Sequence, residues 1–559
     1  MAGLGAGLRT LSTPAAALST REILVFSAVI ATAGLLRAGY TYGANAHLEQ
    51  LPLVLRLLDP AYLQNDFYVT AAAQAANGPR HYYCLLLAGL ARLAPLPAVV
   101  LALTWLSNIF VVAVSMRAAL RLLGTGAAGA VLAGLLAGLV EGFDLGGACF
   151  LQRNVLNPQL LALPLALLVL DSGLRRRPLR AAGLAVPCLL IHPSLGVGVA
   201  LIALSANVLI AAWACVQPGA RGGRGPATAV RQAAVALAVV GAVAWLAWGG
   251  STRPMLNTTE FVETYAYLRN PHHCVPSAFP AAEYARTAIF VLLTLLAFGL
   301  WRGQRVGDRR AARRIPVTIA LVLGGCAAGY VFVELWPTRA AAVAQPFRFL
   351  FVVKWLGFLL IAAVGEMFVI TPLLERWRLR NGLSPWATRL TGAALAVFLA
   401  LFAVHHFRPL PLLWRIFHPL RINYDLADMP GPVARVARLA AECTPPDAVL
   451  LTPPGFGAMR LVGGRAIVVD YREYPFDDAG LAAWRARLEA CYGPLGAATL
   501  SKTGGIHAAM AANYAGLTDA ERAALGAQYG ADYAVLLCNA ATEFPCVAHT
   551  TEFQIVALR

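Results

Sequence analysis

Long apolar runs separated by short polar stretches fill roughly the first 400 residues of the chain. A helix needs ~20 apolar residues to cross the ~30 Å hydrocarbon layer of a bilayer. Two of the runs, 159–171 and 181–192, are short for a full crossing and fit either tilted helices or half-helices. We predict a mainly α-helical, polytopic membrane protein with about 11 transmembrane helices, at residues 22–39, 97–116, 126–141, 159–171, 181–192, 195–215, 231–250, 284–301, 315–336, 347–371 and 388–406.

The pattern changes near residue 425, after a connector at 407–424. Short apolar runs typical of buried strands alternate there with helical periodicity. Thr518 and Glu521 form a capping-box pattern that opens one helix. Residues 425–559 are therefore predicted to form a soluble α/β domain, with strands at 447–452, 466–470, 533–537 and 553–557 and a helix at 481–492.

Arginine clusters fall in every second loop between the predicted spans. Because Lys and Arg accumulate in cytoplasmic loops, this alternation sets the orientation. The N-terminal residues 1–21 are then cytoplasmic, and the transmembrane domain covers residues 22–406. Residues 425–559 lie outside, as do four loops that are richer in acidic, aromatic and His residues: 40–96, 141–158, 251–283 and 337–346.

The composition supports a bilayer and argues against nucleic acid as a partner. The chain is 59% hydrophobic and 13% charged, where soluble proteins carry about 25% charged residues. The formal net charge is +17. Residues 425–559 hold 10 Lys or Arg and 14 Asp or Glu, so the excess of basic residues lies in the membrane part. The near absence of lysine, with Ala, Gly and Leu in excess, favours a bacterial source.

Cysteine spacing predicts no metal site. No CxxC pair occurs in the chain. Residues 425–559 contain four cysteines, and an oxidising compartment would permit disulfides. Cys538 and Cys546 are the favoured pair, while Cys443 and Cys491 are equally well explained as small buried residues.

The first outer loop supplies the candidate catalytic carboxylates. Glu49 and Asp66 follow the first span closely, where an acceptor hydroxyl could meet a lipid-borne donor. Either could act as a general base. The alternative is that Asp66, like Asp59 before Pro60, caps a turn or helix. His47 precedes Glu49 by two residues and could reach the same site from an extended segment.

Later outer segments supply candidate substrate-binding groups. Arg153 lies in the second outer loop, and His192 precedes a proline between two apolar runs. Ionisable residues at such places are functional candidates, although a His beside Pro can simply break a helix. His272 and His273 are adjacent in the third loop, where substrate contact or loop packing is favoured over a metal site.

Two cations enter the span at 347–371. Arg348 lies at its outer end, and Lys354 lies six residues, or ~9 Å of helix rise, deeper. Arg suits bidentate phosphate binding, and cations stabilise a phosphate leaving group. Snorkelling to lipid headgroups is an alternative for Arg348, and for Lys354 a carboxylate such as Glu366 could be its partner. The two positions do not share one stripe of a helix, so both need not contact one ligand.

Short motifs over most of the chain resemble those of a poorly characterised bacterial family of membrane proteins similar to the GT-C superfamily of glycosyltransferases. The matching segments are Tyr42–Pro52, Leu57–Pro60, Asn65-Asp66, His192-Pro193, Asn270–His273, Gln345–Arg348, Thr444–Ala448 and Leu451–Pro454. GT-C enzymes commonly carry their catalytic acidic residue in the first outer loop, often within an acidic pair. This chain has no adjacent acidic pair there, and Glu49 is the nearest match, with Asp66 second.

The resemblance implies sugar transfer from a polyprenyl-phosphate or polyprenyl-diphosphate carrier to an extracytoplasmic glycan, lipid or protein. Many such enzymes recruit Mg²⁺ or Mn²⁺, which this sequence neither requires nor excludes. The expected location is a bacterial inner membrane. Residues 425–559 would bind the acceptor or dock a protein partner. Two other readings remain: a non-catalytic scaffold of a membrane assembly and, with no clear internal repeat to support it, a lipid or solute transporter.

Overall fold

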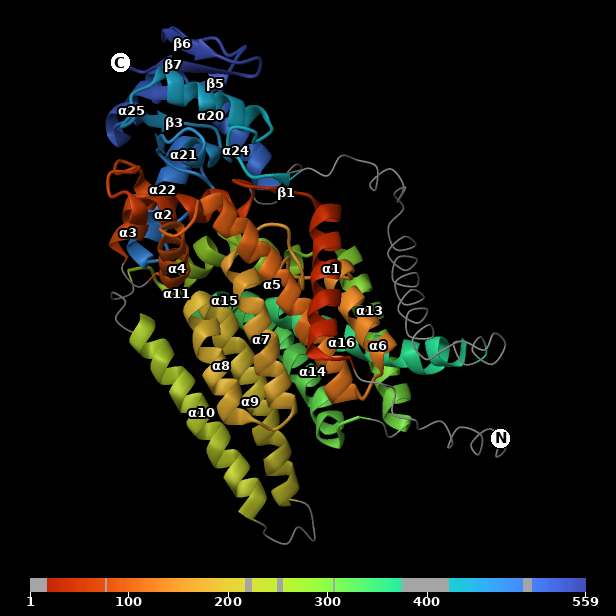
Figure 1. Ribbon diagram of the computed structural model, residues 1–559. Coiled ribbons are helices and arrows are strands. Elements are labelled where there is room, and N and C mark those ends of the chain that lie inside the picture. The colour runs from red at the N-terminus through yellow and green to blue at the C-terminus, as the bar shows by residue number, and fades with distance from the viewer. Residues whose placement is uncertain are drawn as a thin grey trace.

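The computed structural model describes residues 18–75, 78–216, 224–248, 255–304, 307–373, 376, 422–495 and 505–559. The described part is built in three layers, which Figure 1 shows one above another: long helices, a middle layer of short helices, and a domain built on a β-sheet. The long helices are α1 (Thr20–Ala38), α5 (Leu96–Ala118), α6 (Ala127–Leu139), α7 (Pro158–Leu174), α8 (Pro178–Ile191), α9 (Pro193–Val216), α10 (Arg224–Trp248), α13 (Ala281–Gly303), α14 (Arg309–Tyr330) and α16 (Leu350–Gly365).

Among the described residues, five helical segments are long and apolar enough to cross a membrane, judged by length and composition. They are Leu96–Leu123, Pro193–Trp213, Ala281–Gly303, Arg310–Leu335 and Arg339–Leu373. The first ten predicted spans all fall on long helices, but several of these helices, including α6 and α8, are shorter than a full crossing requires. The number of crossings therefore stays a prediction, and the span at 388–406 lies outside the described residues.

Three of the long helices in the described part, α5, α14 and α16, adjoin π-helical or 3-10 turns. The π-helical segments in the described part are η2 (Ala119–Leu123), η3 (Glu263–Arg269), η5 (Val331–Leu335) and η7 (Glu366–Ile370), and the 3-10 segments are η4 (Pro276–Ala278) and η6 (Pro346–Phe349). Such turns redirect side chains and are frequent at functional sites. Two of them, η3 and η6, lie in the middle layer, where they contribute to the cavity described below.

The middle layer consists of short helices from the predicted outer loops. They are α2 (Ala46–Leu58), α3 (Phe67–Gln74), α4 (His81–Ala91), α11 (Thr258–Val262), α12 (Pro271–Cys274) and α15 (Arg339–Ala344). Asp66 caps α3 by accepting a hydrogen bond from the amide of Val69 (3.0 Å). Asn257 and Glu260 form a capping box on α11.

The C-terminal part has the predicted α/β composition. Its five-stranded sheet has the order β4-β3-β5-β7-β6, with β3 parallel to β4 and β5 and with β7 antiparallel to β5 and β6. The strands are β3 (Val449–Leu451), β4 (Ala466–Ile467), β5 (Tyr533–Leu537), β6 (Cys546–His549) and β7 (Phe553–Ala557), and the helices are α20 (Pro432–Cys443), α21 (Ala458–Leu461), α22 (Asp478–Tyr492), α24 (Gly505–Ala515) and α25 (Asp519–Tyr529). The predicted capping box at Thr518 opens α25. Strand β6 was not predicted.

The C-terminal domain shares one hydrophobic core with the middle layer. Tyr68 and Phe261 of the middle layer belong to the same buried cluster as Trp484 and Leu488 of α22. A short parallel ladder also joins β1 (Tyr40–Thr41) to β2 (Ile422–Asn423). Removing residues 425–559 would therefore expose the core of the middle layer, so a truncation does not isolate the role of this domain.

Candidate functional site

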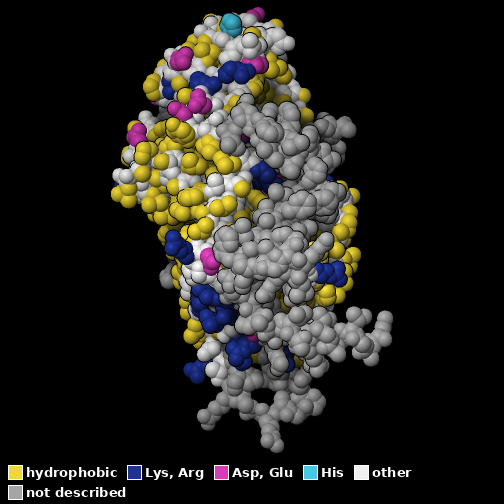
Figure 2. Space-filling model, turned by 45° about the vertical axis from the view of Figure 1, so that its right-hand side comes forward, with side chains coloured by type: hydrophobic (Ala, Val, Ile, Leu, Met, Phe, Trp, Pro, Cys, Tyr) yellow, Lys and Arg dark blue, Asp and Glu magenta, His cyan; other side chains and the backbone are white. Residues whose placement is uncertain are grey.

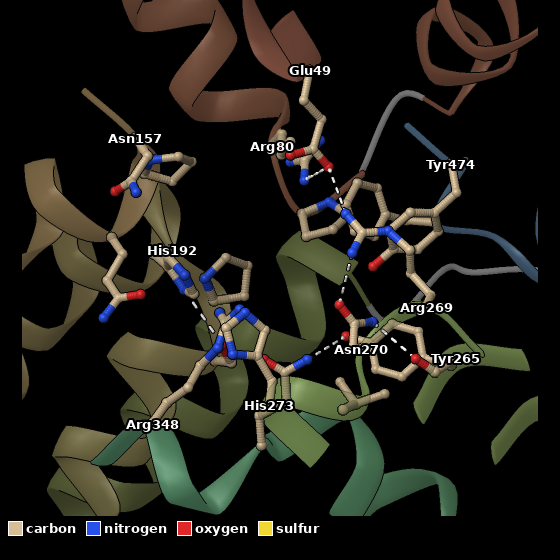
Figure 3. Close-up of a pocket in the computed structure, with 18 of the residues that line it drawn as sticks. Glu49, Arg80, Asn157, His192, Tyr265, Arg269, Asn270, His273, Arg348 and Tyr474 are labelled. Atoms are coloured by element: carbon tan, nitrogen blue, oxygen red, sulfur yellow. Dashed lines mark hydrogen bonds and ion pairs between the residues drawn. The ribbon is translucent and has the colours of Figure 1, made fainter. Parts of the chain in front are cut away.

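A cavity of about 370 Å³ lies where the three layers meet. Figure 3 shows side chains from all three layers pointing into it. Its walls combine charged, amide and aromatic groups: Glu49, Gln50, Arg80, Asn157, Gln159, His192, Ser194, Phe261, Tyr265, Arg269, Asn270, His272, His273, Gln345, Arg348, Tyr474 and Phe476. A concave site with convergent polar groups is the usual form of a ligand-binding pocket.

Glu49 is the single carboxylate among the described residues that line this cavity. It lies in the first turn of α2, just after Asn45, whose φ of 52° is unusual for a residue other than glycine. Its carboxylate forms an ion pair with Arg80, which precedes α4, and lies 3.9 Å from the Arg269 guanidinium. The Tyr68 hydroxyl donates to the Glu49 carbonyl (2.7 Å) and accepts from Arg80 (3.0 Å). These contacts fix Glu49 between two arginines.

Arg269 is positioned by the π-helical turn η3 and by the C-terminal domain. Its Nε and Nη2 donate to the carbonyl of Arg472 at 3.0 and 2.7 Å. Its guanidinium also lies 5.0 Å from the ring centre of Tyr474. The Arg80 guanidinium lies 4.6 Å from the ring centre of Phe476 in the same way. The segment that leads into α22 thus forms the aromatic wall behind both arginines.

Arg348 enters the cavity from η6, opposite Glu49 (Figure 3). The residue before η6 is Gln345, with a left-handed φ of 48° that turns the chain into the cavity wall. Among the described residues, none forms a hydrogen bond or ion pair with the Arg348 guanidinium, and its buried Nε lacks a partner. A buried nitrogen without an acceptor is costly. Arg348 is therefore the candidate group for binding an oxygen of a ligand in this cavity.

Three histidines line the same wall as Arg348. His273 is buried, and its Nδ1 donates to the carbonyl of Gly146 (2.7 Å), which leaves Nε2 as an acceptor. The His272 ring lies 4.0 Å from it, centre to centre. Partial desolvation in the cavity, followed by the charges of Arg269 and Arg348, lowers the pKa of His272. Burial, Arg348 and His272 hold the pKa of His273 well below 6.5. Both rings are neutral at physiological pH.

Replacing His273 should make folding less sensitive to acid. Below pH 6.5 the unfolded His273 takes up a proton while the folded one does not, so wild-type stability falls as the pH falls. His273→Asn removes this term. The free energy of unfolding of wild type minus that of the variant should therefore shrink between about pH 7 and about pH 5, by at most ~1.4 kcal/mol per pH unit. Unfolding in detergent at both pH values measures it.

The exposed His549 of β6 provides the control for this measurement. His549→Asn should leave the pH dependence of unfolding as it is in wild type. A pH dependence of His273→Asn that equals that of wild type would show that His273 titrates normally in the folded protein.

Five of the predicted site residues meet at this cavity. They are Glu49, His192, His272, His273 and Arg348. His192 ends α8, and its Nδ1 accepts from the amide of Leu195 (3.3 Å). The other four predicted residues do not line the cavity.

Asp66 does not reach the cavity and has a structural position. Its carboxylate is fully buried and lies 2.7 Å from Nε of Arg460 on α21. It also accepts from the amides of Val69 and Ile467, both at 3.0 Å. Arg460 in turn contacts Glu473 (3.2 Å). This buried group joins the middle layer to the C-terminal domain, so the expectation that Asp66 acts as a base is replaced by the capping alternative.

His47 is also directed away from the cavity. Its ring is buried against Tyr40 and Tyr42, and its Nδ1 accepts from the amide of Gly43 (3.2 Å). Its place on a helix, two residues from Glu49, separates the two side chains, whereas the expectation of a shared site assumed an extended segment.

Arg153 and Lys354 line a second cavity of about 300 Å³ instead. The predicted pairing of Lys354 with Glu366 is wrong. The Glu366 carboxylate instead accepts hydrogen bonds from the amides of Gly126 (2.7 Å) and Gly129 (2.9 Å) at the start of α6. Twelve helical residues separate Lys354 from Glu366, which is ~18 Å of rise. Glu366 therefore caps α6 and is too distant to pair with Lys354.

The expected disulfide between Cys538 and Cys546 is not formed, and both are free and exposed. Cys538 follows β5 and donates its amide to Glu552, whereas Cys546 pairs with Val556 on the other side of β7. Strand β7 thus lies between them. Two strand spacings are ~9.5 Å, which exceeds the Cα separation that a disulfide spans.

No group of three or more His, Cys, Asp or Glu in the described ranges is arranged to hold a metal ion. His272 and His273 are not joined by a further ligand there, and Glu49 is engaged by arginine. The residues do not fit a divalent ion, so no step below is assigned to one.

The comparison with known families finds a match inside the C-terminal domain. Residues 432–491 match a family described as a domain of unknown function (DUF6798). No curated protein matches the chain. The matched segment runs from α20 almost to the end of α22 and includes Arg460, Glu473, Tyr474 and Phe476. It therefore covers the part of the domain that forms the cavity wall and the buried contact with Asp66.

Sequence reasoning missed Arg80, Tyr265, Tyr474 and Phe476, and did not select Arg269 although it adjoins the Asn270–His273 motif. Arg80 lies in a polar stretch with no periodicity, and Tyr474 and Phe476 are more than 400 residues from Glu49. The one usable signal was the density of Arg and aromatic residues at 471–476, which is high for a predicted loop.

Proposed function

We propose that the protein is a glycosyltransferase that moves a sugar from a polyprenyl-phosphate or polyprenyl-diphosphate carrier to an acceptor hydroxyl outside the cytoplasm. The observation that carries the proposal is the Arg348 guanidinium, which faces the cavity without a partner. A phosphate oxygen is a strong acceptor for such a group.

The charge of the cavity supports an anionic ligand. Arg80, Arg269 and Arg348 face one carboxylate, Glu49, and the neighbouring histidines are neutral. Glu49 offsets Arg80 and lies near Arg269, so positive charge remains around Arg348. Fixed cations in a site shielded from water stabilise the negative charge that develops on a leaving phosphate.

The other walls suit a sugar. Amide groups of Asn157, Gln159 and Gln345 can exchange hydrogen bonds with hydroxyls, and the rings of Tyr474 and Phe476 offer flat apolar faces. Their location where the long helices meet the outer layers would let a sugar enter the cavity while its lipid chain stays among the helices.

The proposed reaction uses Glu49 as the base. The acceptor oxygen forms a bond to the anomeric carbon as the bond from that carbon to the phosphate oxygen breaks. The hydroxyl proton passes to the Glu49 carboxylate, and the phosphate leaves with the bonding electron pair, held by Arg348 and Arg269. No oxidant, reductant or further reactant is needed.

The location we propose is a bacterial inner membrane, with the cavity on the outer side. Figure 2 supports this orientation, because Lys and Arg gather toward the lower end of the helices and Asp and Glu toward the sheet domain on the face shown. The positive-inside rule places the Arg-rich end in the cytoplasm.

Arg348→Ala should weaken binding of a polyprenyl-phosphate sugar by about tenfold to a hundredfold, which is the value of a charge-assisted hydrogen bond. Binding of a radiolabelled donor to purified protein measures it. Arg435→Ala, which removes an arginine from an exposed ion pair with Glu552, is the matched control and should bind donor normally. Equal binding by both variants, or no binding by wild type across a panel of donors, would favour the scaffold alternative.

A further inference from the structure

The loop that joins α6 to α7, residues 140–157, contributes to both cavities. It supplies Asn157 to the first cavity and holds His273 through Gly146. It supplies Arg153 and Asn154 to the second cavity. The two cavities thus share this loop but have no lining residue in common.

This loop is anchored by hydrogen bonds and by close packing. The Asn108 side chain of α5 donates to the carbonyl of Arg153 (2.8 Å), and Asn154 donates to the carbonyl of Gly39 (2.7 Å). Gly147, with φ of +65°, lies against His273, where an added Cβ would come within 3.2 Å of the ring. These contacts fix the loop residues that line each cavity.

Lys354 is the candidate ligand-binding group of the second cavity. The side chain is 1% exposed, yet no described residue forms a hydrogen bond or ion pair with its ammonium. Its Nζ lies over the ring of Phe143, 4.8 Å from the ring centre. A buried ammonium is costly unless an anion or several acceptors satisfy it.

The rest of the lining suits a phosphate attached to an apolar chain. Three basic residues, Lys354, Arg37 and Arg153, line this cavity. The acidic residues in its lining are Glu141 and Asp144. One oxygen of Asp144 already accepts from the amide of Cys149 (2.9 Å). Leu35, Val140 and Phe150 supply an apolar wall.

We propose that this second cavity binds a second phosphate group, held by Lys354 and Arg153, at the same time as the first cavity is occupied. Arg348 and Lys354, six residues apart in one segment, then serve two different ligands. The proposal concerns binding alone and does not rest on sugar transfer. The phosphate can belong to a lipid headgroup or be free in solution.

Decyl phosphate, inorganic phosphate and uncharged decanol are the probes, and native mass spectrometry of the full-length protein counts the molecules bound. Wild type should bind two decyl phosphates, and Lys354→Met and Arg348→Ala should each bind one. Arg153→Gln should weaken the second site alone. Competition by inorganic phosphate at the second site would identify a free anion as the ligand, and its failure would identify a lipid phosphate.

Lys354→Met keeps the side-chain volume and removes a buried charge, so it should melt at or above the wild-type temperature. Arg153 is exposed, so its replacement tests the same site without disturbing the core. Two outcomes would overturn the proposal. In the first, the Lys354→Met and Arg153→Gln variants both bind two decyl phosphates with wild-type affinity. In the second, wild type binds a single molecule, and Arg348→Ala binds none.

Discussion

Glu49→Gln should lower the turnover number for sugar transfer by about 100- to 10 000-fold, the usual contribution of a general base. The amide has the shape of the carboxylate but cannot accept the hydroxyl proton. Donor affinity should not fall, because removing a negative charge beside Arg80 and Arg269 leaves the cavity more favourable to phosphate. Steady-state transfer from a radiolabelled polyprenyl-phosphate sugar and separate donor binding measure the two effects.

The matched control is Glu489→Gln, which changes a half-exposed carboxylate on α22 that is paired with Arg485 (3.0 Å) and does not line the cavity. Turnover should stay at the wild-type level in this variant. If Glu49→Gln retained wild-type turnover, Glu49 would be a positioning partner of Arg80, and Nε2 of His273 would become the candidate base. If both turnover and donor binding were lost, the ion pair with Arg80 would be holding the cavity in shape.

Arg460→Ala should destabilise the folded protein by about 3–5 kcal/mol, the cost of removing one partner of a buried ion pair. Arg460 and Asp66 are both fully buried, 2.7 Å apart. Burial and the neighbouring Asp470 raise the pKa of Glu473 well above 4.5. Asp66, at 2.7 Å against 3.2 Å for Glu473, is the closer carboxylate and the buried charge that loses its partner. Because that charge lies between the middle layer and the C-terminal domain, both should loosen together. Denaturant unfolding in detergent measures the change.

Arg435→Ala provides the contrast, because its ion pair with Glu552 is about half exposed. Exposed pairs contribute about 0–1 kcal/mol. Similar losses of stability in the two variants would show that the buried group does not hold the layers together.

The role of Asp66 could not be predicted from its neighbours in the sequence. An acidic residue before a helix can be a cap or a catalyst, and nothing within ten residues decides between them. Its partner Arg460 is 394 residues away. The same applies to Lys354, whose surroundings come from α1, α5 and the loop at 140–157. Burial and pairing depend on which distant segments pack together, and a single sequence carries little information about that.

By itself, the sequence determined the long apolar helices, the change to an α/β composition near residue 425, and the ionisable residues at the ends of apolar runs that include Glu49, His192, His272 and Arg348. These features follow from local hydropathy and periodicity, which act over a few turns. Only the tertiary structure decided that these four residues share one cavity, that Tyr474 and Phe476 form its aromatic wall, and that Asp66 and Lys354 face elsewhere. Those outcomes depend on contacts between residues hundreds of positions apart, which form only when the layers pack.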